Sequence, residues 1–244
     1  MKRRAGARRF RKQLAVVTGA SRGIGLAVAE ALAAEGCNVV LVGRDPRALQ
    51  AAERRVARHG GRGLTVFADV SKPESAAFVF KMVRQRFGRV DILFNNAGIA
   101  HRITPIAKLS LETWRQVLDT NLTPLLIWTQ KALPLMKRGA TIVNNLSVSA
   151  RKVYPGSAAY TASKFGALGF TETLREELRG RGVRVISLMP GPVNTALWDT
   201  LWPAAPRKRM IRAEDVAHAL VEVLAQPAET TVEELVVAPT SGPL

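Results

Sequence analysis

The chain has 244 residues, 47% of them hydrophobic and 23% charged, which is enough to bury the core of one α/β domain. No apolar run approaches the roughly 18 residues of a membrane-spanning helix, and the single cysteine excludes an intramolecular disulfide or a multi-cysteine metal cluster. Lysine and arginine outnumber the acids 36 to 19, a net charge of +17. Such a charge favours polyanions, but charge runs mostly form solvated surfaces, so we expect neither a nucleic-acid nor a membrane partner.

The basic residues are densest at the start of the chain. Residues 1–12 contain seven of them and no acid, and we expect this segment to be flexible. A very short transit peptide is the alternative interpretation, because such peptides are arginine-rich and poor in acids. The apolar run 14–17 is too short for a signal-peptide core, so the chain is predicted to be cytoplasmic.

Strands and helices alternate along the rest of the chain. Strands are predicted at 14–17, 39–42, 64–67, 91–94, 141–144, 183–188 and 235–237, and helices at 24–35, 46–58, 71–87, about 110–136, 158–179 and about 214–225. The strands are continuous runs of Val, Ile and Leu, which is typical of strands buried on both faces. We therefore predict a single domain, 13–244, of the α/β class. Its architecture is a doubly wound, Rossmann-type, mostly parallel sheet of about seven strands with helices on both faces.

The segment 195–212 does not follow this alternation. It contains Trp198, Trp202 and a basic run, 207–209, between a strand end and the last helix. Long irregular insertions are often lids or binding loops, so we expect a substrate-binding loop here. The two tryptophans either line an apolar pocket or pack the loop onto the body or onto a neighbouring subunit. The sequence leaves these two interpretations open.

A glycine-rich turn joins the first strand to the first helix. Its sequence, Thr18-Gly-Ala-Ser-Arg-Gly-Ile-Gly25, would let a pyrophosphate approach the backbone at the start of the helix, where exposed N–H groups and the helix dipole attract anions. The spacing G-x-x-x-G-x-G in a strand–turn–helix unit predicts a dinucleotide site. The residues expected to contact the cofactor in this turn are Gly19, Ser21, Arg22, Gly23, Ile24 and Gly25.

The end of the second strand bears on the choice of cofactor. An acid there would bind the ribose 2′-hydroxyl of NAD, but this chain has Gly43 followed by Arg44. Arg22 and Arg44 together suit a 2′-phosphate, because arginine offers permanently charged, bidentate donors. We therefore predict NADP(H), although Asp45 is close enough in sequence to reach the ribose.

Tyr160 and Lys164 lie four residues apart at the start of a predicted helix and therefore share one face. A phenol with a pKa near 10 is a poor acid–base catalyst at neutral pH, and a nearby ammonium would lower that pKa. A decrease of about three units requires roughly 4 kcal/mol of differential interaction. Alone, such a pair most often decorates a surface, so its meaning depends on its neighbours.

Several polar residues follow other strands at the same sheet edge. Ser147 lies thirteen residues before Tyr160, just after a strand, and Asn121 lies within the long predicted helix, where a polar residue needs a reason. Ligands bind at the carboxyl ends of the strands in doubly wound sheets, which places Asn95, Ala97, Gly98 and the run from Pro190 to Thr195 at the same edge. Ser149 and Tyr154 compete with Ser147 and Tyr160, but spacing favours the latter pair. His59, His101 and His218 lack metal-ligand spacing, and no metal site is expected.

With these motifs in this order and spacing, the chain resembles the short-chain dehydrogenase/reductase family over residues 14 to about 238. The resemblance implies that Tyr160 is the general acid and base, Ser147 binds the substrate oxygen, Lys164 bonds the nicotinamide ribose, and Asn121 holds a relay water. It also implies that Asp69 and Val70 contact the adenine, that Asn95 packs beside the adenosine, and that Val193 and Thr195 hold the carboxamide. The remaining expected cofactor residues are Ala97, Gly98 and Pro190. Leu146 and Pro124 depart from the usual family pattern, next to Ser147 and near Asn121.

The resulting prediction is an NADP(H)-dependent oxidoreductase that interconverts a carbonyl and a secondary alcohol, and that forms a homodimer or homotetramer as its relatives commonly do. One alternative is a 3-oxoacyl-[acyl-carrier-protein] reductase, although the C-terminal run 233–240 lacks the Asp-Gly-Gly ending common among those enzymes. Another is a non-enzymatic NADP(H)-sensing or nucleic-acid-associated protein. The sequence does not identify the substrate.

Overall fold

Seven short runs of mostly aliphatic residues form one parallel sheet in the computed structural model, which describes residues 8–242 and 244. The strands are β1 (Leu14–Thr18), β2 (Asn38–Gly43), β3 (Gly63–Phe67), β4 (Ile92–Asn95), β5 (Thr141–Asn145), β6 (Arg184–Pro190) and β7 (Glu234–Val237). Their order in the sheet is β3-β2-β1-β4-β5-β6-β7, and every pairing is parallel. The predicted doubly wound sheet of about seven strands is thus confirmed.

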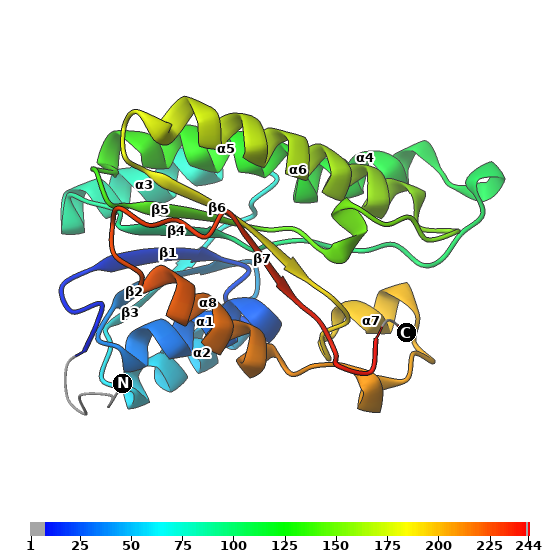
Figure 1. Cartoon of the computed structure of the whole chain (residues 1–244), viewed down its shortest axis with the longest axis horizontal. Coiled ribbons are helices and arrows are strands. Elements are labelled where there is room, and N and C mark those ends of the chain that lie inside the picture. Colours follow the sequence, from blue (N-terminus) through cyan, green and yellow to red (C-terminus); the bar gives the residue numbers. More distant parts are fainter. Residues whose placement is uncertain (1–7, 243) are drawn as a thin grey trace.

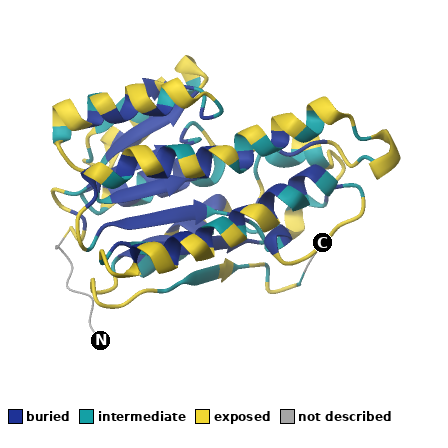
Figure 2. Ribbon diagram, turned by 90° about the horizontal axis from the view of Figure 1, so that it is seen from above, coloured by how far each residue is buried: buried dark blue, intermediate teal, exposed yellow. Residues whose placement is uncertain are grey.

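Helices cover both faces of this sheet (Figure 1). One layer contains α1 (Gly23–Ala34), α2 (Pro46–Arg58) and α8 (Ala213–Leu224), and the other contains α3 (Pro73–Phe87), α4 (Leu111–Asn121), α5 (Thr123–Ala132) and α6 (Ala158–Arg179). Figure 2 shows the central strands buried and the helices exposed along their outer sides. Each face of the sheet therefore has its own apolar core, one packed around α1 and α8 and the other around α3, α5 and α6.

The strand order reverses at β1, which has β2 on one side and β4 on the other. The connections leaving β1 and β4 run to opposite faces of the sheet, and in doubly wound folds such divergence opens a crevice at the carboxyl edge. This switch point is where ligands bind in doubly wound folds. All the turns singled out from the sequence, after β1, β2, β4, β5 and β6, leave the sheet at this edge.

The structure differs from the predicted elements in two places. The helix expected over about 110–136 is broken into α4 and α5 at Leu122, followed by a short 3-10 turn (Leu133–Leu135). Pro124 has no N–H to continue the hydrogen-bond ladder, which explains a break at this point. The segment expected to lack regular structure contains the short helix α7 (Leu197–Leu201) and a 3-10 turn (Arg207–Arg209). Two other 3-10 turns span Ile106–Lys108 and Val148–Ala150.

The end of the basic N-terminal segment packs on the body of the protein. Phe10 is only 3% exposed and belongs to the core around α1. Arg9 pairs with Glu35 at 2.7 Å and with Glu222 at 3.0 Å, which ties the segment to the end of α1 and to α8. Residues 1–7 of the segment predicted to be flexible, 1–12, lie outside the described residues. Within the described part of the chain, no helix is both long enough and apolar enough to cross a membrane.

Candidate active site

The glycine-rich turn uses its glycines for backbone geometry that other residues would disfavour. Gly19 and Gly23 have φ angles of +63° and +57°, in the left-handed region, and a Cβ on Gly25 would collide with the carbonyl oxygen of Gly19. Arg22 is the N-cap residue of α1, with extended backbone and an exposed side chain. Ser21 and Ile24 are half-buried beside it. The first turn of α1 thus presents backbone N–H groups to an anion.

Asn96 and Asn145, which the sequence did not single out, hold this turn in place. The amide of Asn96 donates to the carbonyl oxygens of Thr18 at 2.9 Å and Gly19 at 3.2 Å. The hydroxyl of Thr18 accepts from the backbone N–H groups of Asn96 and Ala97. Asn145 in turn donates to the Asn96 side chain at 2.9 Å. Polar side chains at the ends of three adjacent strands were the signal that could have identified this network.

Asn95 lies at the same edge, but its side chain is 5% exposed. Its amide donates to Asn144 at 2.9 Å, and Asn144 donates to Thr171 on α6 at 2.9 Å. This chain of bonds joins β4, β5 and α6 inside the protein. Asn95 therefore positions the two central strands, while the next residue, Asn96, faces the glycine-rich turn.

The residues expected around the adenosine lie next to one another. The backbone N–H of Ala20 donates to the carbonyl of Val42 at 3.1 Å, which joins the glycine-rich turn to the end of β2. Arg44 follows β2, is exposed, and lies 3.7 Å from the Asp69 carboxylate. Val70, after β3, is 7% exposed. Asp45 caps α2 by accepting from the Ala48 N–H at 3.1 Å, so its carboxylate already has a structural partner.

The Asp69 carboxylate is ionised more readily than usual. Burial opposes its ionisation, but the backbone and hydroxyl of Ser71 both donate to it, and Arg44 and Lys72 lie nearby, so its pKa is lowered. The Asp69 carboxylate pairs with Arg44 at 3.7 Å, and this single contact leaves the other N–H groups of the guanidinium able to bind a ligand. The two charged groups therefore lie where the ribose end of a dinucleotide is expected.

Tyr160 and Lys164 are both buried near the start of α6, with exposed fractions of 9% and 6%. The Lys164 Nζ lies 5.6 Å from the centre of the Tyr160 ring and donates to the carbonyl oxygen of Asn145 at 2.9 Å. Burial lowers the pKa of Lys164 to about 8, because an ammonium is costly to keep away from water. The ammonium therefore titrates within the range of pH in which enzymes commonly work.

The pKa of Tyr160 does not follow the sequence-based expectation. Burial raises it, and a hydrogen bond with the Ser147 side chain only partly opposes that effect. The expected decrease is wrong for the chain alone, because burial removes the water that would stabilise the phenolate. At neutral pH Tyr160 is a protonated phenol held beside Ser147.

Ser147 and not Ser149 is the serine that reaches Tyr160. The Ser147 Oγ also accepts from the backbone N–H of Ser149 at 3.1 Å, which fixes its orientation at the start of a 3-10 turn. Ser149 is buried, and Tyr154 is 41% exposed on the loop before α6. Ser147 and Tyr160, the residues that spacing favoured, are thus the serine and tyrosine that lie together.

Asn121 ends α4 and is 3% exposed. Its amide donates to the Ile99 carbonyl at 2.9 Å and to the Ser163 hydroxyl at 3.1 Å, and its Oδ1 accepts from the Ile99 N–H at 2.8 Å. At the break between α4 and α5, the Leu125 N–H bonds the Leu122 carbonyl at 3.0 Å instead of the Asn121 carbonyl that a continuous helix would use. The side chain thus secures the loop after β4.

The segment after β6 is held close to the glycine-rich turn. Pro190 ends β6, Val193 is 5% exposed, and the Thr195 side chain lies beside Gly23. Trp198 on α7 is half-buried and donates its indole N–H to the Val193 carbonyl at 2.9 Å, whereas Trp202 is 40% exposed. Trp198 therefore packs the loop onto the body, which is one of the two interpretations that the sequence left open.

Arg207 joins the two ends of this loop, a role the sequence did not reveal. Its guanidinium donates to the Thr195 carbonyl at 2.6 Å, to the Asn194 side chain at 3.3 Å and to the Asp199 carboxylate at 2.5 Å. It is 27% exposed. One side chain therefore fixes α7 relative to the residue expected to meet the cofactor.

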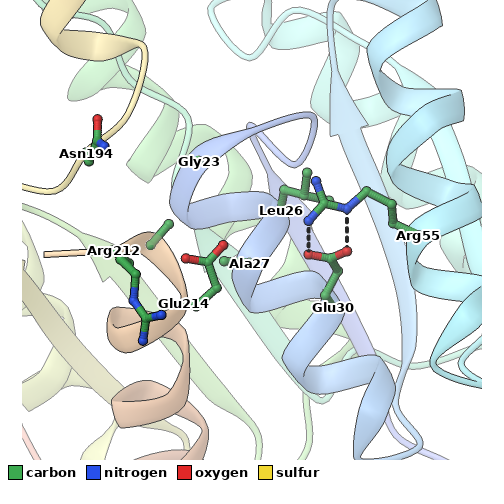
Figure 3. A pocket seen from close by; sticks show the side chains of 9 residues that line it. Gly23, Leu26, Ala27, Glu30, Arg55, Asn194, Arg212 and Glu214 are labelled. Atoms are coloured by element: carbon green, nitrogen blue, oxygen red, sulfur yellow. Dashed lines mark hydrogen bonds and ion pairs between the residues drawn. The ribbon is translucent and has the colours of Figure 1, made fainter.

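A hollow lies beside the glycine-rich turn, between the starts of α1 and α8 (Figure 3). Its charged lining is largely paired internally, since Arg55 bonds Glu30 at 2.6 and 2.7 Å and Arg212 bonds Asp215 at 2.7 Å. It therefore lacks the free donors of a phosphate site. In the described residues, no group of three His, Cys, Asp or Glu side chains could hold a metal ion.

Comparison with known proteins matches residues 13–205 to the family model described as short chain dehydrogenase. Two curated relatives are 37% identical to the chain. A 3-oxoacyl-[acyl-carrier-protein] reductase of Synechocystis aligns over 88% of this chain and 90% of its own length, and a farnesol dehydrogenase of Aedes aegypti over 95% and 97%.

Solved structures show the same likeness. An alcohol dehydrogenase from Thermococcus sibiricus, complexed with 5-hydroxy-NADP, superposes with a TM-score of 0.88 at 30% identity and covers 94% of this chain and 97% of its own. A metagenomic short-chain oxidoreductase in complex with NADP superposes with a TM-score of 0.83 at 30% identity, over 95% of this chain and 99% of its own. The likeness thus extends over nearly the whole chain.

Proposed function

The chain belongs to the short-chain dehydrogenase family of oxidoreductases, and we propose that it reduces a carbonyl to a secondary alcohol at the expense of NADPH. The observation that carries this proposal is the buried pair Tyr160 and Lys164 beside Ser147, at the carboxyl edge of the sheet and next to the glycine-rich turn. Burial of a lysine to this degree is unfavourable, because the ammonium loses its hydration, and it therefore indicates a function other than solvation of the surface. Perturbed titratable groups in such a crevice mark functional sites.

In the proposed reaction, Tyr160 donates its phenolic proton to the carbonyl oxygen of the substrate. Its raised pKa favours this role, because the phenol is protonated at neutral pH. Ser147, which already hydrogen-bonds Tyr160, donates to the same oxygen and stabilises the negative charge that develops there. The bound nicotinamide supplies the hydride, and the protein supplies position and electrostatics.

Lys164 and Asn121 serve the proton supply. The ammonium of Lys164 stabilises the phenolate that remains after transfer, and its Nζ is close enough to the Asn145 carbonyl to be held in one orientation. The side chain of Asn121 is occupied by Ile99 and Ser163, so we assign the relay water to the Asn121 carbonyl, which the helix break releases. Reprotonation of Tyr160 would run from solvent through this water and Lys164.

NADP(H) is the proposed cofactor because Arg22 and Arg44 flank the expected position of the adenosine 2′-phosphate, and because relatives of this fold carry NADP or its analogue. Arg22→Ala and Arg44→Ala should each raise the Kd for NADPH about tenfold, the loss of one charge-assisted contact, and leave the Kd for NADH within about twofold. Arg47→Ala, an exposed arginine in the first turn of α2, is the matched control. Equal affinity of the wild-type protein for both cofactors would contradict the assignment.

The substrate is a small carbonyl compound whose identity is set by the loops around α7. A 3-oxoacyl chain on an acidic carrier protein is a second candidate, supported by the Synechocystis relative but disfavoured by the missing Asp-Gly-Gly ending. The equally similar farnesol dehydrogenase shows that the likeness does not select one substrate. Salt-sensitive turnover on the carrier with little turnover on free thioester analogues would favour the carrier-linked reaction.

Assembly and location are part of the proposal. Leu111 on α4, Leu126 on α5 and Phe165 on α6 are 59%, 47% and 43% exposed, and α4 packs against both α5 and α6. Exposed apolar side chains on neighbouring helices suit an interface between copies of the chain. We propose a homodimer or homotetramer in the cytoplasm. Size-exclusion chromatography with light scattering would test the assembly.

The central experiment is NADPH oxidation against a broad panel of ketones, aldehydes and 3-oxo thioesters. Tyr160→Phe should lower kcat by about 10²-fold or more, because it removes the proton donor while leaving the Kd for NADPH nearly unchanged. Tyr154→Phe is the matched control and should retain activity. Full turnover by Tyr160→Phe would refute the mechanism, whereas NADPH binding with no turnover of any panel member would favour a sensing role.

A further inference from the structure

The amino-terminal edge of the sheet, opposite the candidate active site, carries ten exposed basic side chains that the proposed reaction does not use. In a parallel sheet all segments that enter strands gather at one edge, which faces left in Figure 1. We call the exposed bases in these segments the basic edge. It consists of Arg8, Arg11, Lys12, Arg58, Arg62, Arg86, Arg89, Lys137, Arg138 and Arg181.

Hydrogen bonds between neighbouring segments hold this edge together as one surface. The backbone bonds are Phe10 N to Glu35 O, Val39 N to Arg62 O, Asp91 N to Leu14 O, Val90 N to Leu135 O and Gly139 N to Gly182 O, all between 2.8 and 3.0 Å. The side chain of Arg8 lies against Gly36 and Gly60, and that of Arg138 lies against Gly182. The segments that carry the bases therefore lie in a row that follows the strand order from β3 to β6.

The row carries few counter-charges. The segments that carry it contain two acids, Glu35 and Asp91. The neighbouring segment that enters β7 adds Glu229 and Glu233, of which Glu233 pairs with Arg179. Glu35 pairs with Arg9, which is not a member of the row. Within the part of the chain that the structure describes, Arg89 is the only member of the basic edge that forms an ion pair, with Asp91. A contiguous field of one sign with few counter-charges attracts a polyanion.

The shape and composition of the row narrow the class of polyanion. Six strands at a spacing of about 4.8 Å give a length of about 24 Å, which matches about seven base pairs of duplex. Eight of the ten side chains are arginines, whose guanidinium groups bind phosphate in bidentate fashion.

The absence of large exposed apolar side chains from these segments, as far as the structure describes them, narrows the class of ligand further. Of the large apolar side chains exposed in the described residues, none comes from these strand-entering segments, which argues against insertion into a lipid surface. The phenylalanines of the segments, Phe10 and Phe87, are buried and half-buried, and His59 is the one exposed aromatic ring among the residues described in these segments, so the edge offers no extended platform for stacking unpaired bases.

We propose that the basic edge binds the phosphate backbone of duplex nucleic acid, independently of sequence and at a distance from the catalytic crevice. No helix or ribbon projects from this edge into a groove in the part of the chain that is described, so the contacts would position the protein without reading bases. The proposal does not depend on the proposed reductase activity, since the two sites lie on opposite edges of the sheet. It assigns a role to the charge that the sequence alone suggested was a solvated surface.

The test is fluorescence anisotropy of a labelled DNA duplex of about 20 base pairs with the full-length protein, at several salt concentrations between about 50 and 200 mM. The edge variant combines Arg62→Gln, Arg86→Gln, Lys137→Gln and Arg138→Gln. Each phosphate contact contributes about 0.9 to the slope of log K against log salt, so the slope should become shallower by about three to four, with a Kd at least tenfold higher at 100 mM. Two duplexes of unrelated sequence should bind alike.

The matched control removes the same charge from other exposed positions on helix faces, with Arg54→Gln, Lys81→Gln, Arg115→Gln and Lys131→Gln. This variant should keep the wild-type slope and a Kd within about threefold. Equal weakening by both variants, or an unchanged slope in the edge variant, would overturn the proposal. Edge-dependent binding to phosphatidylserine-rich vesicles or to an acidic protein without binding to the duplex would also overturn it.

Discussion

The side chain of Asn121 pairs with both backbone groups of Ile99, accepting from its N–H at 2.8 Å and donating to its carbonyl at 2.9 Å. This reciprocal pairing ties the end of α4 to the loop after β4. The same loop reaches α7 through the bond from Ile103 N to the Leu201 carbonyl at 3.3 Å, and the loop before α6 through Thr104 N to the Gly156 carbonyl at 2.8 Å. Asn121 therefore anchors a loop that touches two other walls of the site.

Asn121→Ala should be markedly destabilising and should lower kcat/KM for the same reason. It leaves both polar groups of Ile99, which are partly buried, without partners, at a cost of about 1 kcal/mol for each, the lower end of the range for buried groups. Ser163→Ala is the control, because it removes the 3.1 Å bond to the Asn121 amide and keeps the Ile99 pairing. Urea unfolding and NADPH-dependent turnover would measure both effects. Similar behaviour of the two variants would show that the Ile99 pairing contributes little.

The glycines of this chain differ in what they allow. Gly25→Ala should lower the melting temperature and weaken NADPH binding, because a Cβ there would collide with the Gly19 carbonyl oxygen and displace the turn. A methyl group on Gly169, in the exposed part of α6, would meet nothing from the rest of the protein within 4 Å. Gly169→Ala should therefore raise stability by about 0.5–1 kcal/mol through helix propensity. Calorimetry and NADPH titration distinguish the two, and opposite signs for stability are the expected result.

The sequence predicted the architecture well because its strongest signals are local. Buried parallel strands appear as aliphatic runs, and the glycine-rich turn must follow the first strand to bind a phosphate. The break at Leu122 was missed because a hydrophobic pattern continues through Pro124, and only the missing N–H reveals the interruption. The short helix α7 was missed because five residues are too few for periodicity to appear.

The part of the site that sequence reasoning missed depends on long-range contacts. Asn96 holds the glycine-rich turn from 77 and 78 residues away, and Arg207 reaches back across its loop to Thr195. The raised pKa of Tyr160 was also missed, because the depth at which a side chain is buried cannot be read from the i, i+4 spacing of Tyr160 and Lys164. Spacing identifies which groups meet, and packing decides their protonation.

Removal of the Arg207 guanidinium should loosen both α7 and Thr195, the residue expected to contact the cofactor. Arg207→Ala should raise the KM for NADPH about tenfold with a smaller effect on kcat, because it removes charge-assisted bonds to Thr195 and Asp199 that fix the cofactor side of the loop. Lys208→Ala, at the exposed neighbouring position, is the control for charge, and Arg207→Lys should recover only part of the loss. A fall in kcat with an unchanged KM would place the role of Arg207 in the chemical step instead.

The buried ammonium of Lys164 should make stability depend on pH in a defined direction. Its pKa in the folded protein is about 8, below the ordinary value of 10.5, so between these values the unfolded chain binds more protons and stability rises with pH. Relative to Lys164→Met, the wild-type protein should gain roughly 2 kcal/mol between pH 8 and pH 10, from 1.36 kcal/mol per pKa unit. Urea unfolding at both pH values measures the difference. Carbonyl reduction should fall over the same range, because the ammonium that stabilises the Tyr160 phenolate loses its proton, and Lys164→Met should be nearly inactive throughout. A stability difference that does not change with pH would mean that Lys164 keeps an ordinary pKa despite its burial.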